Sequence, residues 1–364
     1  MAAALREINE SQSTIKLKED FIIVQGDVVS NASLQGAIEM HMSAKKSNKS
    51  KDGGEGASVI MTKIFAPIPY ANPVRNPRQE LALLLDQETR QILDYSQYQA
   101  VGEGGAIANS YKLNKNHVDL KKQARQYELR CDVIDSEIAI CSKSIFTHLE
   151  ADFALQTLKE EFILQLNTSE ITDDMTQAYI LPPNYYFGEV SDPRTYAVIT
   201  QDIIARKCYP FVVDFPVFHA TPQFHKMVYS ETPFNKYVAM NVKRHLTSRI
   251  SDSTVIGDNS VVGENSTVEQ SVIGANCKIG KNVTIRRSII WDNTEIHDNC
   301  TVDDSLICDN VVVNANCVVE PGTRLDKNVQ VNQGVVLATQ TLASCRQAVQ
   351  NGTKLEFPPV SEVD

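Results

Sequence analysis

An aliphatic residue recurs every six residues through the last third of the chain, with a five-residue step once per repeat. Four segments beginning at Ser253, Gln270, Arg287 and Asp304 align at a spacing of 17 residues. A six-residue period fits neither an α-helix nor a strand of a flat amphipathic sheet. It predicts a three-sided prism, a left-handed parallel β-helix over 250–342, in which each hexad supplies one short strand and one corner. The aliphatic series is Ile256, Val262, Val268, Ile273, Ile279, Ile285, Ile290, Ile296, Val302, Ile307, Val313, Val319, Leu325, Val331 and Leu337.

The residue three positions after most of these aliphatic residues is Asn or Gly. Both types tolerate a positive φ, which a tight corner requires. The residue four positions after is small or β-branched and is expected to point into the narrow interior. We therefore interpret Cys277, Cys300 and Cys317 as inward packing residues. The predicted corner residues are Asn259, Asn265, Asn276, Asn282, Asn293, Asn299, Asn310, Asn316, Gly322, Asn328 and Gly334.

The preceding 245 residues alternate between strand-like and helix-like patterns, which predicts an α/β domain with a mixed sheet. We expect this domain at 1–230, a connecting segment at 231–249, the β-helix at 250–342 and a tail at 343–364. The predicted strands are 21–24, 58–65 and 131–141, with a hairpin over 81–95. The predicted helices are 33–44, 145–166 and 195–206.

Composition narrows the functional classes. The net charge is −10, which disfavours nucleic-acid binding, and the only dense cationic stretch, Lys45 to Lys51, is expected to be a solvated loop. The chain has no apolar run of transmembrane length and no secretory signal, and its eight cysteines include no CxxC pair. We expect a cytosolic protein without cofactor or metal.

Asp27 follows the predicted strand F-I-I-V and the pair Gln-Gly. Ligands of parallel α/β sheets gather at the carboxyl ends of strands. A carboxylate at this position could hold a magnesium ion that bridges phosphates, although a simple turn explains the pattern equally well.

An α/β domain followed by a hexapeptide β-helix resembles the sugar-nucleotide pyrophosphorylase family. The strand-Gly-Asp pattern at 21–27 and Y-Y-F-G-E-V-S-D-P-R-T-Y at 185–196 carry this resemblance. The second segment looks like the family motif W-x-D-[IV]-G-x-P-x-x-Y, with Phe187, Glu189 and Ser191 in place of Trp, Asp and Gly. The resemblance implies that Asp27 and Glu189 are vestigial nucleotide or metal positions. The family's phosphate-binding loop G-x-G-T-R-L is missing, so we expect no transferase activity.

The chain is also similar to the epsilon subunits of translation initiation factor 2B, the guanine-nucleotide exchange factor for initiation factor 2. D-F-I-I-V-Q-G-D-V-V-S-N at 20–31, R-C-D-V-I-D-S-E-I-A-I-C-S at 130–142, Y-A-V-I-T-Q-D-I-I-A-R-K-C-Y-P at 196–210 and the repeats at 271–292 carry this similarity. It implies the scaffold portion of an epsilon subunit, with the gamma subunit, the regulatory subunits and initiation factor 2 as partners. The helical HEAT domain that carries exchange in that family would follow the β-helix, so we expect no intrinsic exchange without it.

Three further residues are singled out. Asp152 and Phe153 align with an Asn-Phe pair that contributes to exchange in the family, so the resemblance implies a contact with initiation factor 2, in which Asp lacks the amide donor of Asn. Trp291 follows the inward Ile290 and should face outward as an interface residue. We predict no catalytic residue.

Two enzymatic alternatives stay open. One is a sugar-nucleotide pyrophosphorylase that uses Asp27 and Glu189. The other is a hexapeptide acyltransferase, whose catalytic His lies between β-helices. His297 is the only histidine of the repeats, and an isolated surface His accounts for it more simply.

Overall fold

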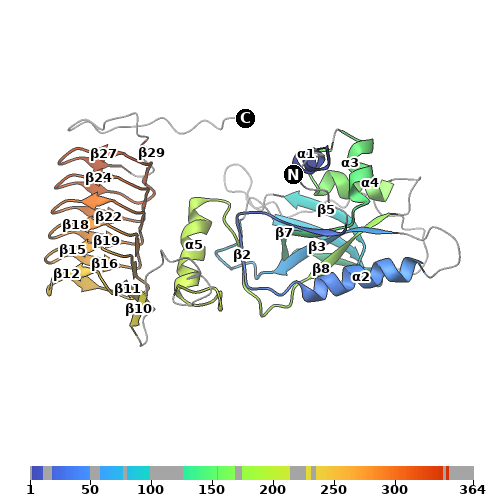
Figure 1. Ribbon diagram of the computed structural model, residues 1–364, viewed down its shortest axis with the longest axis horizontal. Coiled ribbons are helices and arrows are strands. Elements are labelled where there is room, and N and C mark those ends of the chain that lie inside the picture. Colours follow the sequence, from blue (N-terminus) through green and yellow to red (C-terminus); the bar gives the residue numbers. More distant parts are fainter. Residues whose placement is uncertain are drawn as a thin grey trace. The chain divides into compact units, whose positions relative to one another are not determined.

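The computed structural model describes residues 2–10, 19–49, 58–76, 80–98, 126–153, 155–168, 174–213, 227–230, 235–338 and 342–343. The chain divides into two compact units, Met1–Tyr196 and Ala197–Asp364. The first holds the α/β elements and the second the β-helix (Figure 1). None of the helices within the described ranges has the length and apolarity that a membrane crossing requires.

The main sheet of the N-terminal unit has the strand order β1-β7-β3-β8. Its strands are β1 (Phe21–Val24), β7 (Val133–Cys141), β3 (Val59–Pro67) and β8 (Met175–Ile180). β7 runs antiparallel to both β1 and β3, whereas β3 and β8 are parallel. The predicted mixed sheet is therefore confirmed.

Two smaller sheets complete this unit. β4 (Glu80–Asp86) pairs antiparallel with β5 (Ile92–Tyr98), as the predicted hairpin requires, and with β6 (Tyr127–Arg130). β2 (Val28–Ser30) pairs antiparallel with β9 (Phe187–Glu189).

Helices cover both faces of the main sheet (Figure 1). Ala37 of α2 (Gln35–Lys49) packs with β-strand residues on one face. α1 (Ala2–Glu10), α3 (Ile145–Ala151) and α4 (Glu160–Thr168) contribute to the larger apolar core.

The structure corrects two predictions. The helix predicted over 145–166 is two helices, because Asp152 adopts an extended backbone with φ −135° and ends α3. Lys45 and Lys46, predicted in a solvated loop, lie in α2, where the Lys45 ammonium donates to both carboxylate oxygens of Asp20 at 2.8 Å. Lys51 lies outside the described residues.

α5 (Pro193–Ile204) begins with a local cap that its sequence specifies. The Thr195 N–H donates to Asp192 Oδ1 at 2.6 Å, and the Asp192 N–H donates back to Thr195 Oγ1 at 3.0 Å. Proline at the first helical position needs no such partner. Towards its end, Ile204 packs on Tyr237 and Val255 of the β-helix.

Three sheets of short strands form the β-helix, and all their pairings are parallel except that between β10 and β11. The first sheet contains β10 (Met227–Ser230), β11 (Lys236–Ala239), β14 (Val255–Ile256), β17 (Val272–Ile273), β20 (Ile289–Ile290), β23 (Leu306–Ile307), β26 (Arg324–Leu325) and β29 (Leu342–Ala343). The second contains β12 (Lys243–Arg244), β15 (Val261–Val262), β18 (Lys278–Ile279), β21 (Glu295–Ile296), β24 (Val312–Val313) and β27 (Gln330–Val331). The third contains β13 (Arg249–Ile250), β16 (Thr267–Glu269), β19 (Thr284–Arg286), β22 (Thr301–Asp303), β25 (Val318–Val319) and β28 (Val336–Leu337).

The predicted aliphatic stack is present. Ile256, Ile273, Ile290 and Ile307 pair in register on four successive coils, and all four are buried. They belong to one continuous apolar core that runs inside the β-helix. Because each buried aliphatic side chain contributes roughly 1.5–3 kcal/mol, this core is the main stabilising element of the coil stack.

The predicted corners are also confirmed, since all eleven Asn and Gly positions have a positive φ, for example 56° at Asn276 and 82° at Gly322. Sequence reasoning missed the corners at the five-residue steps. They place Ser253, Gln270, Arg287 and Asp304 at φ between 40° and 51°.

Small inward residues tie successive coils together. Ser260 Oγ donates to the Gly274 carbonyl at 2.8 Å and accepts from the Cys277 N–H at 3.0 Å. The thiols of Cys277, Cys300 and Cys317 reach backbone carbonyls in the same way, and all three cysteines are buried.

Candidate functional site

Asp27 and Glu189, which are far apart in the sequence, are brought together by the pairing of β2 and β9. Val28 lies opposite Glu189 in that pair, and the Val190 N–H donates to the Asp27 carbonyl at 2.9 Å. Asp27 Oδ1 is buried and has no hydrogen-bond partner within the described part of the chain. The structure therefore places the two acids predicted from the sequence at one site.

Next to these acids lies a buried polar group that sequence reasoning missed. The Lys63 ammonium is 2.5 Å from Asp135 Oδ2 and 4.9 Å from the centre of the Tyr95 ring. The Tyr95 hydroxyl donates to the same carboxylate at 2.8 Å. Buried charges need partners of this kind, so the three side chains stabilise one another.

Glu137 connects this group with Glu189, which in turn interacts electrostatically with Asp27. The backbone of Glu137 has φ 54°, a conformation that costs a non-glycine residue of order 1–3 kcal/mol. The Glu137 N–H donates to Asp135 Oδ1 at 2.9 Å, Oε1 lies 2.5 Å from the Lys159 ammonium, and Oε2 accepts from the Gln25 amide. Strained residues of this kind concentrate at functional sites.

Crowding of carboxylates shifts their pKa values. Burial, together with the charges of Glu137 and Asp27, raises the pKa of Glu189 to about 7, although Lys159 opposes the shift. Burial and the charge of Asp135 raise the pKa of Glu137. Burial alone would also raise the pKa of Asp135, but the adjacent Lys63 ammonium holds it below its usual value.

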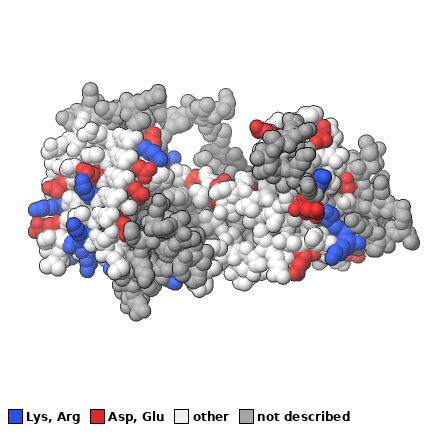
Figure 2. Space-filling model, in the orientation of Figure 1, with Lys and Arg blue, Asp and Glu red and all other residues white. Residues whose placement is uncertain are grey.

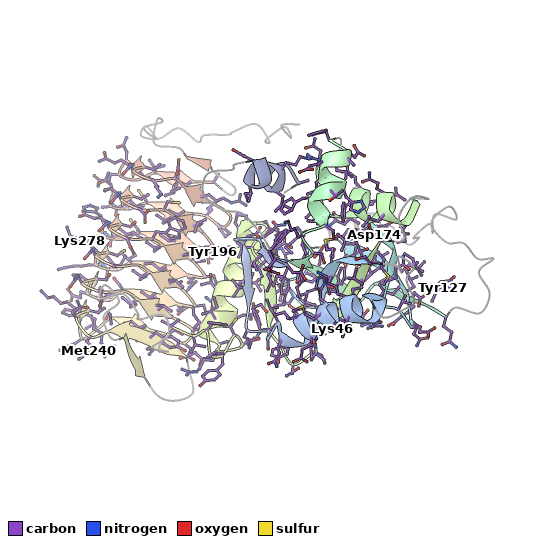
Figure 3. The ribbon with its side chains drawn as sticks, turned by 45° about the vertical axis from the view of Figure 1, so that its right-hand side comes forward. Lys46, Tyr127, Asp174, Tyr196, Met240 and Lys278 are labelled. Carbon is purple, nitrogen blue, oxygen red and sulfur yellow. The ribbon has the colours of Figure 1, made fainter. Side chains whose placement is uncertain are left out.

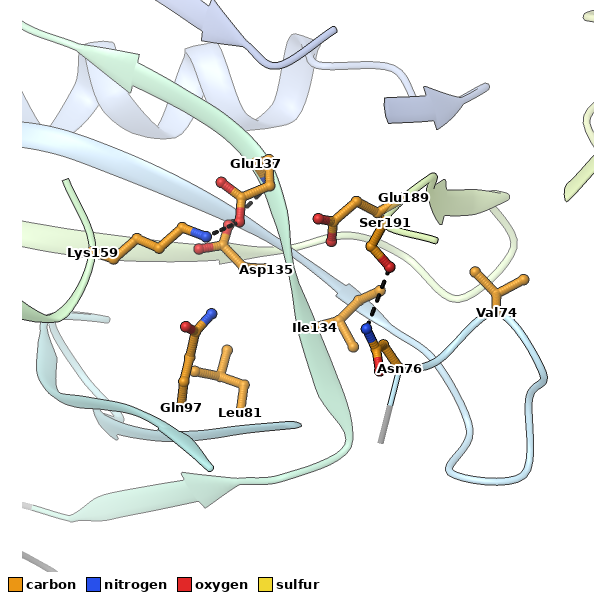
Figure 4. Close-up of a pocket in the computed structure, with 10 residues that line it drawn as sticks. All are labelled: Val74, Asn76, Leu81, Gln97, Ile134, Asp135, Glu137, Lys159, Glu189 and Ser191. Atoms are coloured by element: carbon orange, nitrogen blue, oxygen red, sulfur yellow. Dashed lines mark hydrogen bonds and ion pairs between the residues drawn. The ribbon is translucent and has the colours of Figure 1, made fainter. Parts of the chain in front are cut away.

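The charged side chains described above line two cavities, and both cavities include Gln97, Glu137 and Lys159. The smaller has a volume of about 60 Å³ and contains Glu189 and Asp135 (Figure 4). The larger has a volume of about 360 Å³. Its remaining lining residues are Ile23, Gln25, Met61, Lys63, Ile138, Ala139, Thr157 and Leu158.

These residues do not fit a divalent metal ion. Magnesium and calcium take six or more oxygen ligands, several of them carboxylate oxygens. Within the described ranges, no group of three His, Cys, Asp or Glu side chains is arranged to hold a metal. The orphaned Asp27 Oδ1 is one suitable ligand atom, but the neighbouring acids Asp135 and Glu137 are engaged by lysine.

One signal in the sequence pointed to this cluster. The trio Asp135, Ser136 and Glu137 interrupts an otherwise apolar strand whose flanks are buried. A polar trio inside a buried strand requires partners, but the sequence does not reveal that Lys63 and Lys159 supply them.

Asp152 and Phe153 lie in the turn after α3, away from these cavities along the chain. The Phe153 side chain is 68% exposed. The Arg6 guanidinium lies 5.5 Å from the centre of the Phe153 ring and donates to the carbonyls of Leu149, Asp152 and Leu155 at 2.8–2.9 Å. α1 therefore holds the turn that presents Phe153.

Trp291 and His297 both lie on the outside of the β-helix. Trp291 is half-buried, and the Lys327 ammonium lies 5.9 Å from the centre of its ring. The His297 ring is half-exposed and lies 3.9 Å from Glu295, a contact typical of a surface side chain. Both residues extend from corners next to inward aliphatic residues, as the hexapeptide pattern predicted.

This fold defines the class of proteins in which a mixed α/β sheet is followed by a parallel β-helix of hexapeptide repeats. Within that class, residues 234–337 match the family model described as "EIF2B subunit epsilon LbH domain".

Curated proteins point to the same subunit. The chain is 31% identical over 256 residues to the translation initiation factor eIF2B subunit epsilon of Dictyostelium discoideum, an alignment that covers 70% of this chain and 32% of that protein. It is 26% identical over 231 residues to the subunit of the same name from Schizosaccharomyces pombe, covering 63% and 31%. The chain thus spans about a third of the length of the curated relatives it matches. The predicted similarity to eIF2B epsilon subunits is confirmed.

Proposed function

We propose that this chain acts as the scaffold portion of an epsilon-type subunit of eIF2B, the factor that promotes GDP/GTP exchange on translation initiation factor 2. The observation that carries the proposal is the match of the β-helix to the eIF2B epsilon family model, supported by two relatives that bear the name of that subunit. The proposed partners are the gamma subunit, the regulatory subunits and initiation factor 2. The proposed location is the cytosol.

The β-helix offers surfaces of two kinds for such partners. One is charged: Lys278 pairs with Glu295 at 2.6 Å and Arg287 with Asp303 at 2.8 Å, and Figure 2 shows the two signs interspersed over the rod. Lys278 and Met240 project from the outside of the β-helix (Figure 3). The other kind consists of separate exposed apolar side chains at Met240, Leu246, Val261, Val318 and Val336, of which Val318 and Val336 are neighbours on adjacent strands.

Trp291 is the interface residue of this proposal on the β-helix, because aromatic side chains contribute strongly to protein interfaces. The Lys327 ammonium over its ring orients the indole without covering it completely. The domain boundaries predicted from the sequence are also part of this proposal, with one correction. β11, β12 and β13 pair with the next coil, so the predicted connecting segment at 231–249 contains the first coil of the β-helix.

Asp152 and Phe153 are the proposed contact with initiation factor 2. Arg6 fixes the turn around Phe153 by three hydrogen bonds to neighbouring backbone carbonyls, so the exposed phenylalanine loses little conformational entropy when a partner covers it. Asp152 accepts from the Gln165 amide at 3.3 Å, so its carboxylate is oriented within the turn.

The pyrophosphorylase alternative is disfavoured. Asp27 and Glu189 do lie together, but lysine side chains engage the acids around them, and the pKa of Glu189 is about 7. A pyrophosphorylase would need both acids charged and free to bind a metal that bridges phosphates. Release of pyrophosphate from a sugar phosphate and a nucleoside triphosphate would revive this alternative.

Affinity purification of the chain from a eukaryotic extract tests the proposal. We expect recovery of the gamma subunit and the regulatory subunits, and capture of initiation factor 2 that falls about tenfold in Phe153→Ala. Tyr70→Ala is a matched control, because Tyr70 is 64% exposed and also lies 5.5 Å from an arginine. Failure to recover any eIF2B subunit would contradict the scaffold role. Equal losses in the two variants would contradict the specific role of Phe153.

A further inference from the structure

The main sheet of the N-terminal unit has one closed edge and one edge that is open among the described strands. At the β8 edge, the Ala178 N–H donates to the Arg90 carbonyl at 2.9 Å. The next residue, Gln91, forms a bridge with Gln177 of the same strand. At the opposite edge, β1 pairs with β7 alone. β1 therefore presents a row of backbone polar groups that has no strand partner in the described part of the chain.

The register of β1 identifies the backbone groups that face this open edge. Successive residues of an antiparallel strand direct their N–H and C=O groups to opposite sides. The Gln25 N–H donates to the Glu137 carbonyl at 3.3 Å, so Gln25 and, two positions earlier, Ile23 face β7. The intervening residues Ile22 and Val24 therefore direct their N–H and C=O groups to the open edge.

The side chains of the same two residues are exposed, Ile22 by 42% and Val24 by 56%. Ile22 lies opposite Ile140 of β7, and Val24 lies opposite Ile138. Opposite residues of an antiparallel pair project from the same face of the sheet. Ile138 and Ile140 are buried in one cluster with Ala37 of α2. The apolar layer beneath α2 thus continues onto β1, where its side chains are exposed.

α2 adds two more exposed apolar side chains beside β1. Lys45 of α2 donates to Asp20, the residue that precedes β1, so this side of the helix lies next to the strand. Ile38 and Met42 lie on the same side at helical spacing from Lys45, and both are exposed. We call the four exposed residues Ile22, Val24, Ile38 and Met42 the apolar edge.

Another edge strand of this unit, β6, carries charges that β1 lacks. Arg130 of β6 pairs with Glu128 at 2.9 Å, and Arg90 pairs with the same glutamate at 3.1 Å. Charged side chains on an edge strand oppose the addition of a further strand. β1, with the sequence F-I-I-V, contains neither a charged residue nor a proline. Its composition therefore favours the binding of a strand.

We propose that the apolar edge is a docking site for an extended segment of a protein partner, which adds a strand to β1. Apolar side chains at alternate positions of that segment cover Ile22 and Val24, while its backbone bonds to their outward N–H and C=O groups. Glu19 and Asp20 precede β1 and Asp27 follows it, so basic residues on both sides of the apolar run complement the site. This docking site belongs to the N-terminal unit and does not depend on the scaffold function.

The test measures binding of the labelled peptide K-V-T-V-T-V-K to the full chain by fluorescence anisotropy. We expect saturation below about 1 mM peptide. The peptide K-V-V-V-T-T-K has the same composition without the alternation and should bind at least about tenfold more weakly. Val24→Pro removes one outward N–H and should weaken binding about tenfold. Leu129→Thr changes an exposed apolar residue of β6 and should leave binding unchanged.

Hydrogen exchange of the wild type keeps the test decisive if Val24→Pro does not fold. The bound peptide should slow the exchange of two amides in the fragment 20–25, those of Ile22 and Val24, by at least about tenfold.

Three results would overturn the proposal. The first is the absence of both saturation and amide protection at about 1 mM peptide. The second is a folded Val24→Pro that binds the peptide as tightly as the wild type. The third is a wild-type dimer in sedimentation velocity that Val24→Pro dissociates, because the edge would then belong to a second copy of this chain.

Discussion

In the β-helix, each side chain is placed by neighbours a fixed number of residues away, whereas the polar pocket of the N-terminal unit joins residues from distant segments. Ile273 meets Ile290 because both occupy the same position of a 17-residue coil. Lys159 meets Glu137, and Glu189 meets Asp27, only because strands and helices of different segments pack together. A repeated local pattern thus produces a dry and uniform interior, and non-local packing produces a strained and charged one.

The largest effect should follow from placing a charge in the uniform interior. Ile279→Asp puts an unpaired carboxylate among buried aliphatic side chains and should lower the free energy of unfolding by about 4 kcal/mol. Val261→Asp is the control, because Val261 faces outward and is 39% exposed. Urea denaturation of both variants measures the difference. Equal losses would show that the side chains do not divide into inward and outward sets.

In the N-terminal unit, the second largest loss of stability should follow from removing one charge of a buried pair. Lys63→Met leaves Asp135 buried without its cation and should cost about 3 kcal/mol in the same measurement. The double variant Lys63→Met/Asp135→Leu should recover much of that loss, since neither charge then remains. A double variant that is less stable by the sum of both single losses would contradict the coupling.

The corners of the β-helix should be less sensitive than its interior. Asn276→Val forces a β-branched residue to φ 56° and should lower the free energy of unfolding by about 1–2 kcal/mol. Asn276→Gly removes the strain but also the side-chain hydrogen bond to Asn293, so it should cost less. A melting temperature for Asn276→Val equal to that of the wild type would contradict the corner assignment.

The smallest effect should be the pH dependence that the pocket gives to the free energy of unfolding. Because the pKa of Glu189 is raised to about 7 in the folded chain, its contribution to stability is present below the ordinary Glu value and is lost as the pH rises through 7. The wild type should therefore lose on the order of 1 kcal/mol relative to Glu189→Gln between pH 5 and about 8. Urea denaturation at several pH values measures the free energy of unfolding of both proteins. An equal pH dependence of the two free energies would contradict the raised pKa of Glu189.

The same contrast explains what the sequence could and could not predict. The aliphatic stack and the Asn corners follow from local repetition, so their positions were predicted residue by residue. The corner at Gln270 was missed because its residue type differs from coil to coil. The break after α3 was missed because the apolar pattern continues through Leu155 and Leu158, which are buried without being helical.

The candidate site was predictable only in part. Resemblance to a known motif identified Asp27 and Glu189, and the structure brings them together. No local pattern revealed that Lys159 would face Glu137, or that Arg6 would hold the turn of Phe153, because both contacts join segments that are separated in sequence. Such contacts depend on tertiary packing, which periodicity and spacing do not encode.

Sedimentation velocity of the purified chain mixed with purified eIF2B gamma subunit tests the scaffold role most directly. The proposal predicts a discrete complex of the two chains that persists in Lys159→Gln and Phe153→Ala, because neither residue belongs to the β-helix. Two independently sedimenting species over the whole concentration range, with the β-helix intact by circular dichroism, would contradict the central claim.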